Sequence, residues 1–171
     1  WKLPGDPTEV YEWVFKPRVD AQPHVEAMYA FMKKQGYKKF AWMSAGTAFG
    51  RGAKEIMEAT YKQAGMELVA AEEYGPNDSD MTSQLTRIKG KDFDFILIYA
   101  AETAGALAYK QARELGIKKP IIADAPMVST AILSTLGQYL GGLIVCVHIP
   151  DIPDLNALPK KVAAMGPVIA K

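Results

Sequence analysis

Three residues of this 171-residue chain have the types and the order of a serine hydrolase triad. Ser44, Asp124 and His148 each stand where a predicted strand ends, and they follow one another in the chain order of the α/β-hydrolases. Trp42, however, occupies a place where the sharp turn before such a nucleophile needs a small residue. His148 is followed at once by Ile149-Pro150, which leaves no loop to bring its ring back to Ser44. Hydrolysis by these three residues is therefore kept as an alternative hypothesis.

A glycine-rich segment at 46–52 follows a predicted strand and opens a predicted helix, which is where a phosphate group could bind. Its sequence, Gly-Thr-Ala-Phe-Gly-Arg-Gly, matches neither the dinucleotide-binding pattern nor the P-loop pattern. Phe49 in the middle of the loop would also crowd a pyrophosphate. We interpret these glycines as residues that allow a tight turn and close packing of the helix that follows.

Composition argues against several other kinds of site. A single cysteine and two histidines cannot by themselves supply a tetrahedral zinc site, nor can one cysteine form an internal disulfide. A calcium-binding loop beginning at Asp78 would need a glutamate where Lys89 stands. The net charge of +1 argues against a general nucleic-acid binder, and the lysine pairs, scattered near predicted helix ends, complement helix dipoles. We therefore expect no metal, no cofactor and no nucleic-acid partner.

Short apolar runs recur at nearly even spacing and predict the strands that position the polar residues. They lie at 13–15, 40–43, 68–71, 93–99, 121–123 and 143–147. The runs at 95–99 and 143–147 are continuous rather than alternating, which is typical of strands covered on both faces. Between the runs, apolar residues recur with the helical period, and three of the predicted helices stop at left-handed glycine caps.

This alternation predicts an α/β fold with a doubly wound, mostly parallel sheet and helices on both faces. We expect a loop or crossover at 1–10, the α/β lobe at 11–149, and a linker at 150–171 that runs into a helix cut short. The unfinished helix suggests a piece of a longer protein. The segment 125–150 has no Asp, Glu, Lys or Arg, but its serines, threonines and glycines predict a short helix, a turn and a buried strand rather than a membrane span.

Ligands of such sheets bind outside the carboxyl ends of the strands, which selects the loops at 44–50, 100–103 and 124–128. These loops place a few hydroxyls and carboxylates on a largely apolar surface. Such a surface suits the binding of a small organic molecule better than acid–base catalysis. The candidate ligand-binding residues are Ser44, Thr47, Ala48, Phe49, Ala101, Glu102, Asp124 and Ala125.

Five segments carry a recognisable pattern. They are Phe-Lys-Pro-Arg-Val-Asp at 15–20, Gly-Tyr-Lys-Lys-Phe at 36–40, Thr-Ala-Phe-Gly-Arg-Gly at 47–52, Asp-Met-Thr-Ser-Gln-Leu-Thr-Arg-Ile at 80–88 and Lys-Gln-Ala-Arg-Glu-Leu-Gly at 110–116. Together they resemble the type I periplasmic binding proteins, and in particular the leucine/isoleucine/valine-type receptors of ABC importers. The resemblance covers about residues 11–150 and corresponds to the second lobe of these two-lobe receptors.

The resemblance implies a receptor that does no chemistry. In this family a ligand is clamped between two lobes and delivered to the membrane subunits of an ABC importer, so the implied location is periplasmic or otherwise extracytoplasmic. The first lobe is missing from this chain. We therefore expect the isolated lobe to bind ligand weakly and to self-associate through its uncovered cleft face.

The resemblance also implies roles for individual residues. Phe49 matches an aromatic ligand contact, and Ala101 or Glu102 matches a contact in a later loop. A glutamate that holds the ligand's ammonium group in the amino-acid receptors falls on Ala125 here, and Asp124 replaces it only if the loop turns differently. The expected ligand is thus a branched-chain or aliphatic amino acid, or an aromatic or aliphatic carboxylic acid. A ligand-sensing domain of a regulator or receptor with the same fold is a further alternative.

Overall fold

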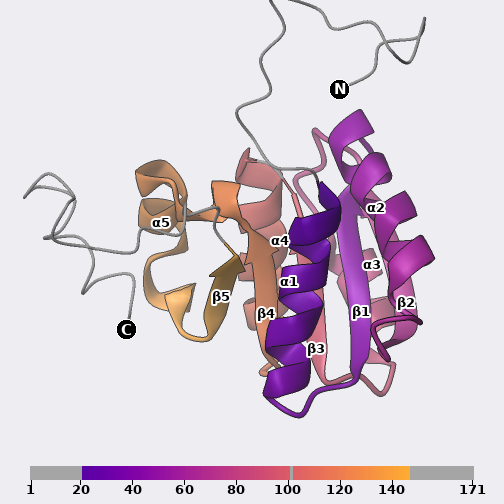
Figure 1. Ribbon diagram of the computed structural model, residues 1–171. Helices are drawn as coiled ribbons and strands as arrows, with labels where there is room; N and C mark the ends of the chain where they lie inside the picture. The colour runs from indigo at the N-terminus through magenta and orange to yellow at the C-terminus, as the bar shows by residue number, and fades with distance from the viewer. Residues whose placement is uncertain (1–20, 101, 147–171) are drawn as a thin grey trace, which may run out of the picture.

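Five parallel strands lie at the centre of the computed structural model, which describes residues 21–100 and 102–146 (Figure 1). Their order across the sheet is β2-β1-β3-β4-β5, and every neighbouring pair is parallel. The strands are β1 (Lys39–Ala45), β2 (Glu67–Tyr74), β3 (Phe95–Tyr99), β4 (Ile121–Asp124) and β5 (Leu143–Cys146).

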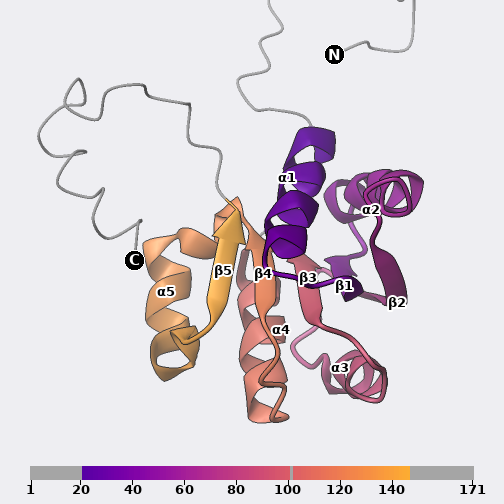
Figure 2. The ribbon, with the colours of Figure 1, turned by 60° about the horizontal axis from the view of Figure 1, so that its bottom comes forward.

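Helices precede and connect the strands. They are α1 (Ala21–Lys34), α2 (Ala48–Thr60), α3 (Thr82–Lys89), α4 (Glu102–Glu114), α5 (Thr130–Leu136) and the short 3-10 helices η1 (Ala125–Val128) and η2 (Gly137–Leu140). Helices α1 and α2 cover one face of the sheet, and α3 and α4 cover the other (Figure 2). The predicted α/β fold with a parallel sheet between helices is therefore confirmed.

The central strands bury both of their faces because successive side chains point to opposite sides. In β1, Phe40 and Trp42 pack with the apolar side chains of α1 and α2, whereas Ala41 and Met43 pack with those of α3 and α4. The same division runs through β3, whose five residues are all buried. The sheet thus separates two apolar clusters, and the polar residues of interest lie where these clusters end.

Several sequence-based expectations can be compared directly with this fold. Gly36, Gly65 and Gly116 follow α1, α2 and α4 with φ of 83°, 73° and 77°, as predicted for left-handed helix stops. Among the described residues β5 lies at the edge of the sheet and is half-buried, so the prediction that 143–147 is buried on both faces is wrong for 143–146, whereas Val147 lies outside the described residues. The predicted strand at 13–15, the loop at 1–10 and the linker and helix at 150–171 lie outside the described residues.

Two general features of the described part bear on function. Within residues 21–100 and 102–146, no helix is both long enough and apolar enough to cross a membrane. In the same part of the chain, the histidine, cysteine and carboxylate side chains nowhere gather into a group of three that could hold a metal ion.

Candidate functional site

The carboxyl ends of β1 and β3 form the point where the strand order reverses. The chain passes from β1 outward to β2 and then returns past β1 to β3. Helix α2 leaves β1 on one face of the sheet, and α4 leaves β3 on the opposite face. Loops that diverge in this way open a crevice outside the carboxyl ends of the strands, and ligands of open α/β sheets bind there. The carboxyl ends of the strands lie at the upper edge of the sheet in Figure 1, where α1 and α2 begin.

Ser44 and Tyr99 are register partners at this switch point. Tyr99 belongs to the apolar cluster under α1 and α2, and Ser44 shares that face because it stands two residues after Trp42. Ser44 is fully buried, and its hydroxyl has no hydrogen-bond partner among the described residues. This hydroxyl is thus a buried polar group at the switch point whose hydrogen-bonding capacity is not used by the described residues.

Phe49 extends the aromatic surface from Tyr99 toward the first turn of α2. The two ring centroids are 4.9 Å apart at an interplanar angle of 31°, and Tyr99 in turn stacks on Trp42 at 5.7 Å. Phe49 is half-buried, and it also lines a groove of about 470 Å³ between the first turns of α1 and α2. The partly exposed Phe49 ring, backed by the buried Tyr99 and Trp42, supplies the apolar wall expected of a site for a small organic molecule.

His24 ties Asp124 to the end of β5. Its Nδ1 lies 2.9 Å from Asp124 Oδ1, and its Nε2 lies 3.0 Å from the carbonyl oxygen of Cys146. The side chains of His24 and Asp124 are almost entirely buried, and the His24 ring packs against the edge of Tyr99 with centroids 6.1 Å apart. The carboxylate of Asp124 also accepts the backbone N–H of Ala125 at 2.8 Å, which starts η1.

These contacts set the charge of His24. Burial alone lowers the pKa of the ring, but the hydrogen bonds to Asp124 and Cys146 and the negative charge of Asp124 outweigh burial and raise the pKa to about 10. His24 is therefore protonated at neutral pH, and both ring nitrogens act as donors. The result is a buried ion pair between α1 and β4.

The loop 46–52 forms the start of α2 rather than a phosphate cradle. Thr47 is the N-cap, and its Oγ1 accepts the backbone N–H of Gly50 at 3.2 Å. A Cβ at Gly50 would lie 2.0 Å from the carbonyl oxygen of Ala45, so close packing of the helix on β1 requires glycine there. Ala48 is exposed in the first turn. Glycine therefore has the packing role that the sequence predicted at position 50.

The structure brings most of the predicted site residues to one edge. Phe49, Tyr99, His24 and Asp124 form a continuous series of contacts across it, with Ser44 beside Tyr99. Thr47, Ala48 and Ala125 lie in the adjoining helix starts, where Ala125 is half-buried. Ala101 lies outside the described residues, and Glu102 begins α4, with nothing described of its side chain.

The hydrolase alternative fails on this geometry. Asp124, the proposed acid of the triad, pairs with His24, whose other ring nitrogen is bonded to a backbone carbonyl instead of the Ser44 hydroxyl. Ser44 itself is fully buried. His148 lies outside the described residues.

Two residues that connect the site were not identified from the sequence. Tyr99 was predicted only as the end of a buried strand, and His24 was not singled out at all. A signal existed for His24, because it stands four residues before Met28 and therefore on the same apolar face of its helix. A polar ring on such a face must find a buried partner.

The comparisons with known proteins agree with the fold. A family model described as periplasmic binding protein matches residues 3–166. The chain belongs to the periplasmic binding protein family. Members of this family are solute-binding proteins rather than enzymes, which confirms the prediction that this chain is not an enzyme.

Individual relatives of this periplasmic binding protein share its fold over most of the chain. The Leu/Ile/Val-binding protein BraC3 of Rhizobium johnstonii is 26% identical over 154 residues, covering 90% of this chain and 41% of the relative. An extracellular ligand-binding receptor from Rhodopseudomonas palustris is 27% identical, with a TM-score of 0.66, covering 70% of this chain and 33% of that one. LivJ of Streptococcus pneumoniae, solved with isoleucine, is 21% identical, with a TM-score of 0.67, over 84% of this chain and 42% of its own. The chain thus spans less than half the length of each.

Proposed function

We propose that this chain is the second lobe of an extracytoplasmic solute-binding receptor that delivers a small organic ligand to an ABC importer. The ligand binds at the carboxyl edge of the sheet, and a first lobe closes over it. Family membership supports this proposal, and so does the course of the chain. His24 in the first turn of α1 contacts Cys146 at the end of β5, so the described domain begins and ends at the edge that holds the candidate site.

The aromatic surface at the switch point is the observation that carries the proposal. Phe49 presents a half-buried ring at the place where open α/β sheets bind ligands, and this ring packs on the buried Tyr99, the register partner of Ser44. An apolar wall with a hydroxyl suits a ligand that has an aliphatic or aromatic body and a polar end. Closure follows because a ligand that contacts both lobes favours the closed arrangement.

The position of Asp124 favours a carboxylic acid over an amino acid. Its carboxylate is fully buried and bonded to His24, and the next position is Ala125. Asp124 is therefore already committed to a cation of the protein, and an alanine offers no negative charge for a ligand's ammonium group. A branched-chain amino acid is the second candidate, favoured by the name of the Leu/Ile/Val-binding relative.

A pair of ligands that differ by one group separates these candidates. Leucine and 4-methylpentanoate share the same carbon skeleton, but the second lacks the ammonium group. In isothermal titration of the protein that carries both lobes, we expect 4-methylpentanoate to bind at least tenfold more tightly than leucine, because leucine would desolvate an unpaired ammonium. Tighter binding of leucine would identify an amino-acid receptor, and no binding of either would contradict both candidates.

Substituting Phe49, with a second phenylalanine as the control, tests whether the binding surface lies at Phe49. Phe49→Ala should weaken binding by more than ~1 kcal/mol, because it removes a ring stacked at the site. Phe31→Ala is the control, since Phe31 is 41% exposed near the other end of α1. Equal affinity of the Phe49→Ala variant and the unmodified protein would remove Phe49 from the site.

The regulator alternative predicts the same ligand contacts but a different partner and location. An importer receptor is released from cells by osmotic shock of the outer membrane and raises the ATPase activity of its importer when loaded with ligand. A ligand-sensing domain does neither.

A further inference from the structure

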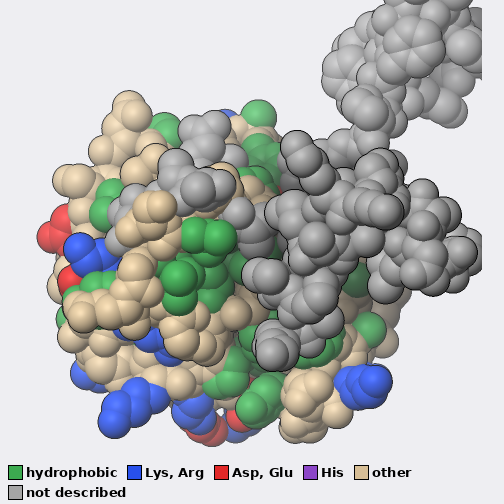
Figure 3. Space-filling model, turned by 90° about the vertical axis from the view of Figure 1, so that its left-hand side faces the viewer, with side chains coloured by type: hydrophobic (Ala, Val, Ile, Leu, Met, Phe, Trp, Pro, Cys, Tyr) green, Lys and Arg blue, Asp and Glu red, His purple; other side chains and the backbone are tan. Residues whose placement is uncertain are grey.

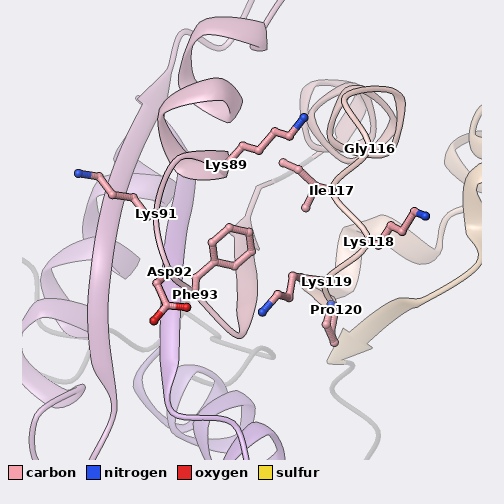
Figure 4. Close-up of a pocket in the computed structure, with 9 residues that line it drawn as sticks. All are labelled: Lys89, Lys91, Asp92, Phe93, Gly116, Ile117, Lys118, Lys119 and Pro120. Atoms are coloured by element: carbon pink, nitrogen blue, oxygen red, sulfur yellow. The ribbon is translucent and has the colours of Figure 1, made fainter.

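A second pocket lies at the amino edge of the sheet, at the opposite ends of the strands from the candidate ligand site. It has a volume of about 520 Å³ and lies between the turn that precedes β3 and the turn that precedes β4 (Figure 4). Its apolar surface comes from Phe93, Ile117 and Pro120, of which Phe93 and Ile117 are nearly fully buried. This volume falls within the range of small-molecule sites in proteins.

Cations surround this apolar surface. The side chains of Lys89 and Lys119 extend across the pocket on either side of the Phe93 ring, whereas Lys91 and Lys118 point away from it (Figure 4). Lys89 Nζ donates to the carbonyl oxygen of Leu115 at 2.8 Å, which leaves two of its ammonium protons for a ligand. Lys119 Nζ lies 5.8 Å from the centroid of the Phe93 ring.

This edge of the sheet carries more lysines than the even spread of lysines along the sequence suggests. The lysine pairs at 33–34, 38–39 and 118–119 are scattered along the chain, but the fold brings them together near the starts of the strands. Figure 3 shows several Lys and Arg side chains along the lower rim of the molecule, which is this edge of the sheet, with Asp or Glu side chains between them. Asp92 is the carboxylate among the residues that line the pocket, and it pairs with Lys39 at 2.7 Å. Four lysines and one carboxylate thus line the pocket.

Hydrogen bonds fix the shape of the pocket wall. The Arg113 guanidinium donates to the carbonyl oxygens of Ile117 at 2.7 Å and Lys119 at 2.9 Å, and it reaches Gly142 at 3.2 Å. The turn that carries Lys118 and Lys119 is thus held in place by α4. A wall that is already ordered loses little entropy when a ligand binds.

We propose that this amino-edge pocket binds a small organic anion with an apolar body, such as an aliphatic or aromatic carboxylate. The body packs along the apolar lining of Phe93, Ile117 and Pro120, and the carboxylate accepts hydrogen bonds from the ammonium group of Lys119, with Lys89 adding a second positive charge on the other side of the Phe93 ring. An inorganic anion would leave the apolar surface unused, and an uncharged molecule would leave the two ammonium groups without an anion. The site is separate from the candidate ligand site and does not depend on its function.

A nuclear magnetic resonance titration of the 171-residue chain tests the proposal with hexanoate as the probe. We expect saturable shifts at the backbone amides of 91–93 and 116–119, and at least threefold weaker binding of hexan-1-ol and of inorganic phosphate. Shifts without saturation, or shifts confined to Phe49 and Tyr99, would overturn the proposal. Equal affinity for phosphate would mean that charge alone causes binding and that the apolar lining contributes nothing, which would also overturn the proposal.

Two substitutions that remove charges of opposite sign, and should therefore change the affinity in opposite directions, give a second test. Lys119→Gln should weaken hexanoate binding about threefold, because it removes one partly exposed charge contact. Asp92→Asn should tighten binding by a similar factor, since it removes the carboxylate that repels the ligand. Lys34→Gln, at the end of α1 and outside the pocket, is the matched control. Unchanged affinity in both pocket variants would contradict the proposal. Binding of a tetraglutamate peptide without binding of hexanoate would instead identify a protein-docking surface.

Discussion

His24 joins three elements through two short contacts. Its ring belongs to α1, its Nδ1 contacts Asp124 of β4, and its Nε2 contacts the Cys146 carbonyl of β5. The two ends of the described domain are therefore held together by one protonated side chain. Removing one member of such a buried ion pair leaves the other charge uncompensated, which typically costs several kcal/mol.

The raised pKa of His24 predicts that stability falls as the pH rises. The folded state holds a proton that the unfolded chain releases near pH 6.5, so the ion pair stabilises fully below pH 6.5 and is lost as the pH rises through about 10. The free energy of unfolding should decrease from about pH 7 to about pH 9.5, with a slope of at most about 1.4 kcal/mol per pH unit. Urea denaturation at a series of pH values measures this slope.

His24→Gln is the control for that slope. Glutamine can donate to Asp124 but does not titrate, so the variant should be less stable at neutral pH and nearly independent of pH in this window. Burial raises the pKa of Tyr29 and Tyr74, so these two hydroxyls stay neutral there. An equally steep decline in the variant would show that other groups cause it.

Single residues of the site could be predicted where a strand end determines their place. Ser44, Phe49 and Asp124 follow apolar runs, and the carboxyl-end rule places them together without further information. The contact between His24 and Cys146 joins residues 122 positions apart, and no local pattern encodes such a pairing. The ion pair between Asp124 and His24, on which the proposed preference for a carboxylic acid partly rests, was therefore visible only in the fold.

At the scale of elements, the start of α2 depends on a close approach between its first turn and β1. Gly50 is buried, and a Cβ there would lie 2.0 Å from the carbonyl oxygen of Ala45. Gly50→Ala should therefore lower the free energy of unfolding by about 2 to 3 kcal/mol through overpacking. Thermal or urea denaturation measures the change.

The same helix provides the matched substitution. Gly52 lies two residues further on, and a Cβ there would meet nothing within 4 Å. Gly52→Ala should raise stability by about 0.5 to 1 kcal/mol, because alanine loses less backbone entropy in a helix. Equal effects of the two substitutions would contradict the role assigned to Gly50.

The elements themselves were largely predictable because the periodicity of the apolar residues and the positions of the helix-ending glycines agree along the chain. Apolar runs of strand length alternate with helical stripes, and three glycine stops have the positive φ expected of them. The error at β5 arose because an apolar run looks the same in an edge strand as in a central one. Strand order decides which it is, and the order is set by tertiary packing rather than by local sequence.

At the scale of the whole molecule, the charged side chains are unevenly distributed, although the net charge is close to zero. A chain with a net charge of +1 nevertheless carries a cationic amino edge, because the lysines cluster where helices end and strands begin. The opposite edge holds the aromatic and hydroxyl groups of the candidate site. The two edges thus differ in chemistry. The lysine-rich amino edge suits anions, and the carboxyl edge suits molecules with an apolar body.

Self-association of the isolated lobe remains a prediction. Among the described residues, the exposed large hydrophobic side chains are Phe31 and Leu140, and neither follows the carboxyl end of a strand. Association through the candidate site would therefore depend on the half-buried Phe49 and its neighbours. Sedimentation velocity across micromolar concentrations measures it, and a single monomeric species throughout would contradict it.

The affinity of one lobe compared with two tests the proposed mechanism as a whole. The described lobe offers contacts along one edge only, so a ligand bound there keeps its other side in water. In the proposed mechanism, closure by a second lobe would bury that side and add its own contacts, which would shift the population toward the closed state. The 171-residue chain alone should therefore bind 4-methylpentanoate at least about 100-fold more weakly than the two-lobe protein, a difference of about 2.7 kcal/mol. Titration calorimetry of both proteins makes the comparison. Equal affinities would mean that this edge alone forms the complete site and that closure contributes nothing to binding.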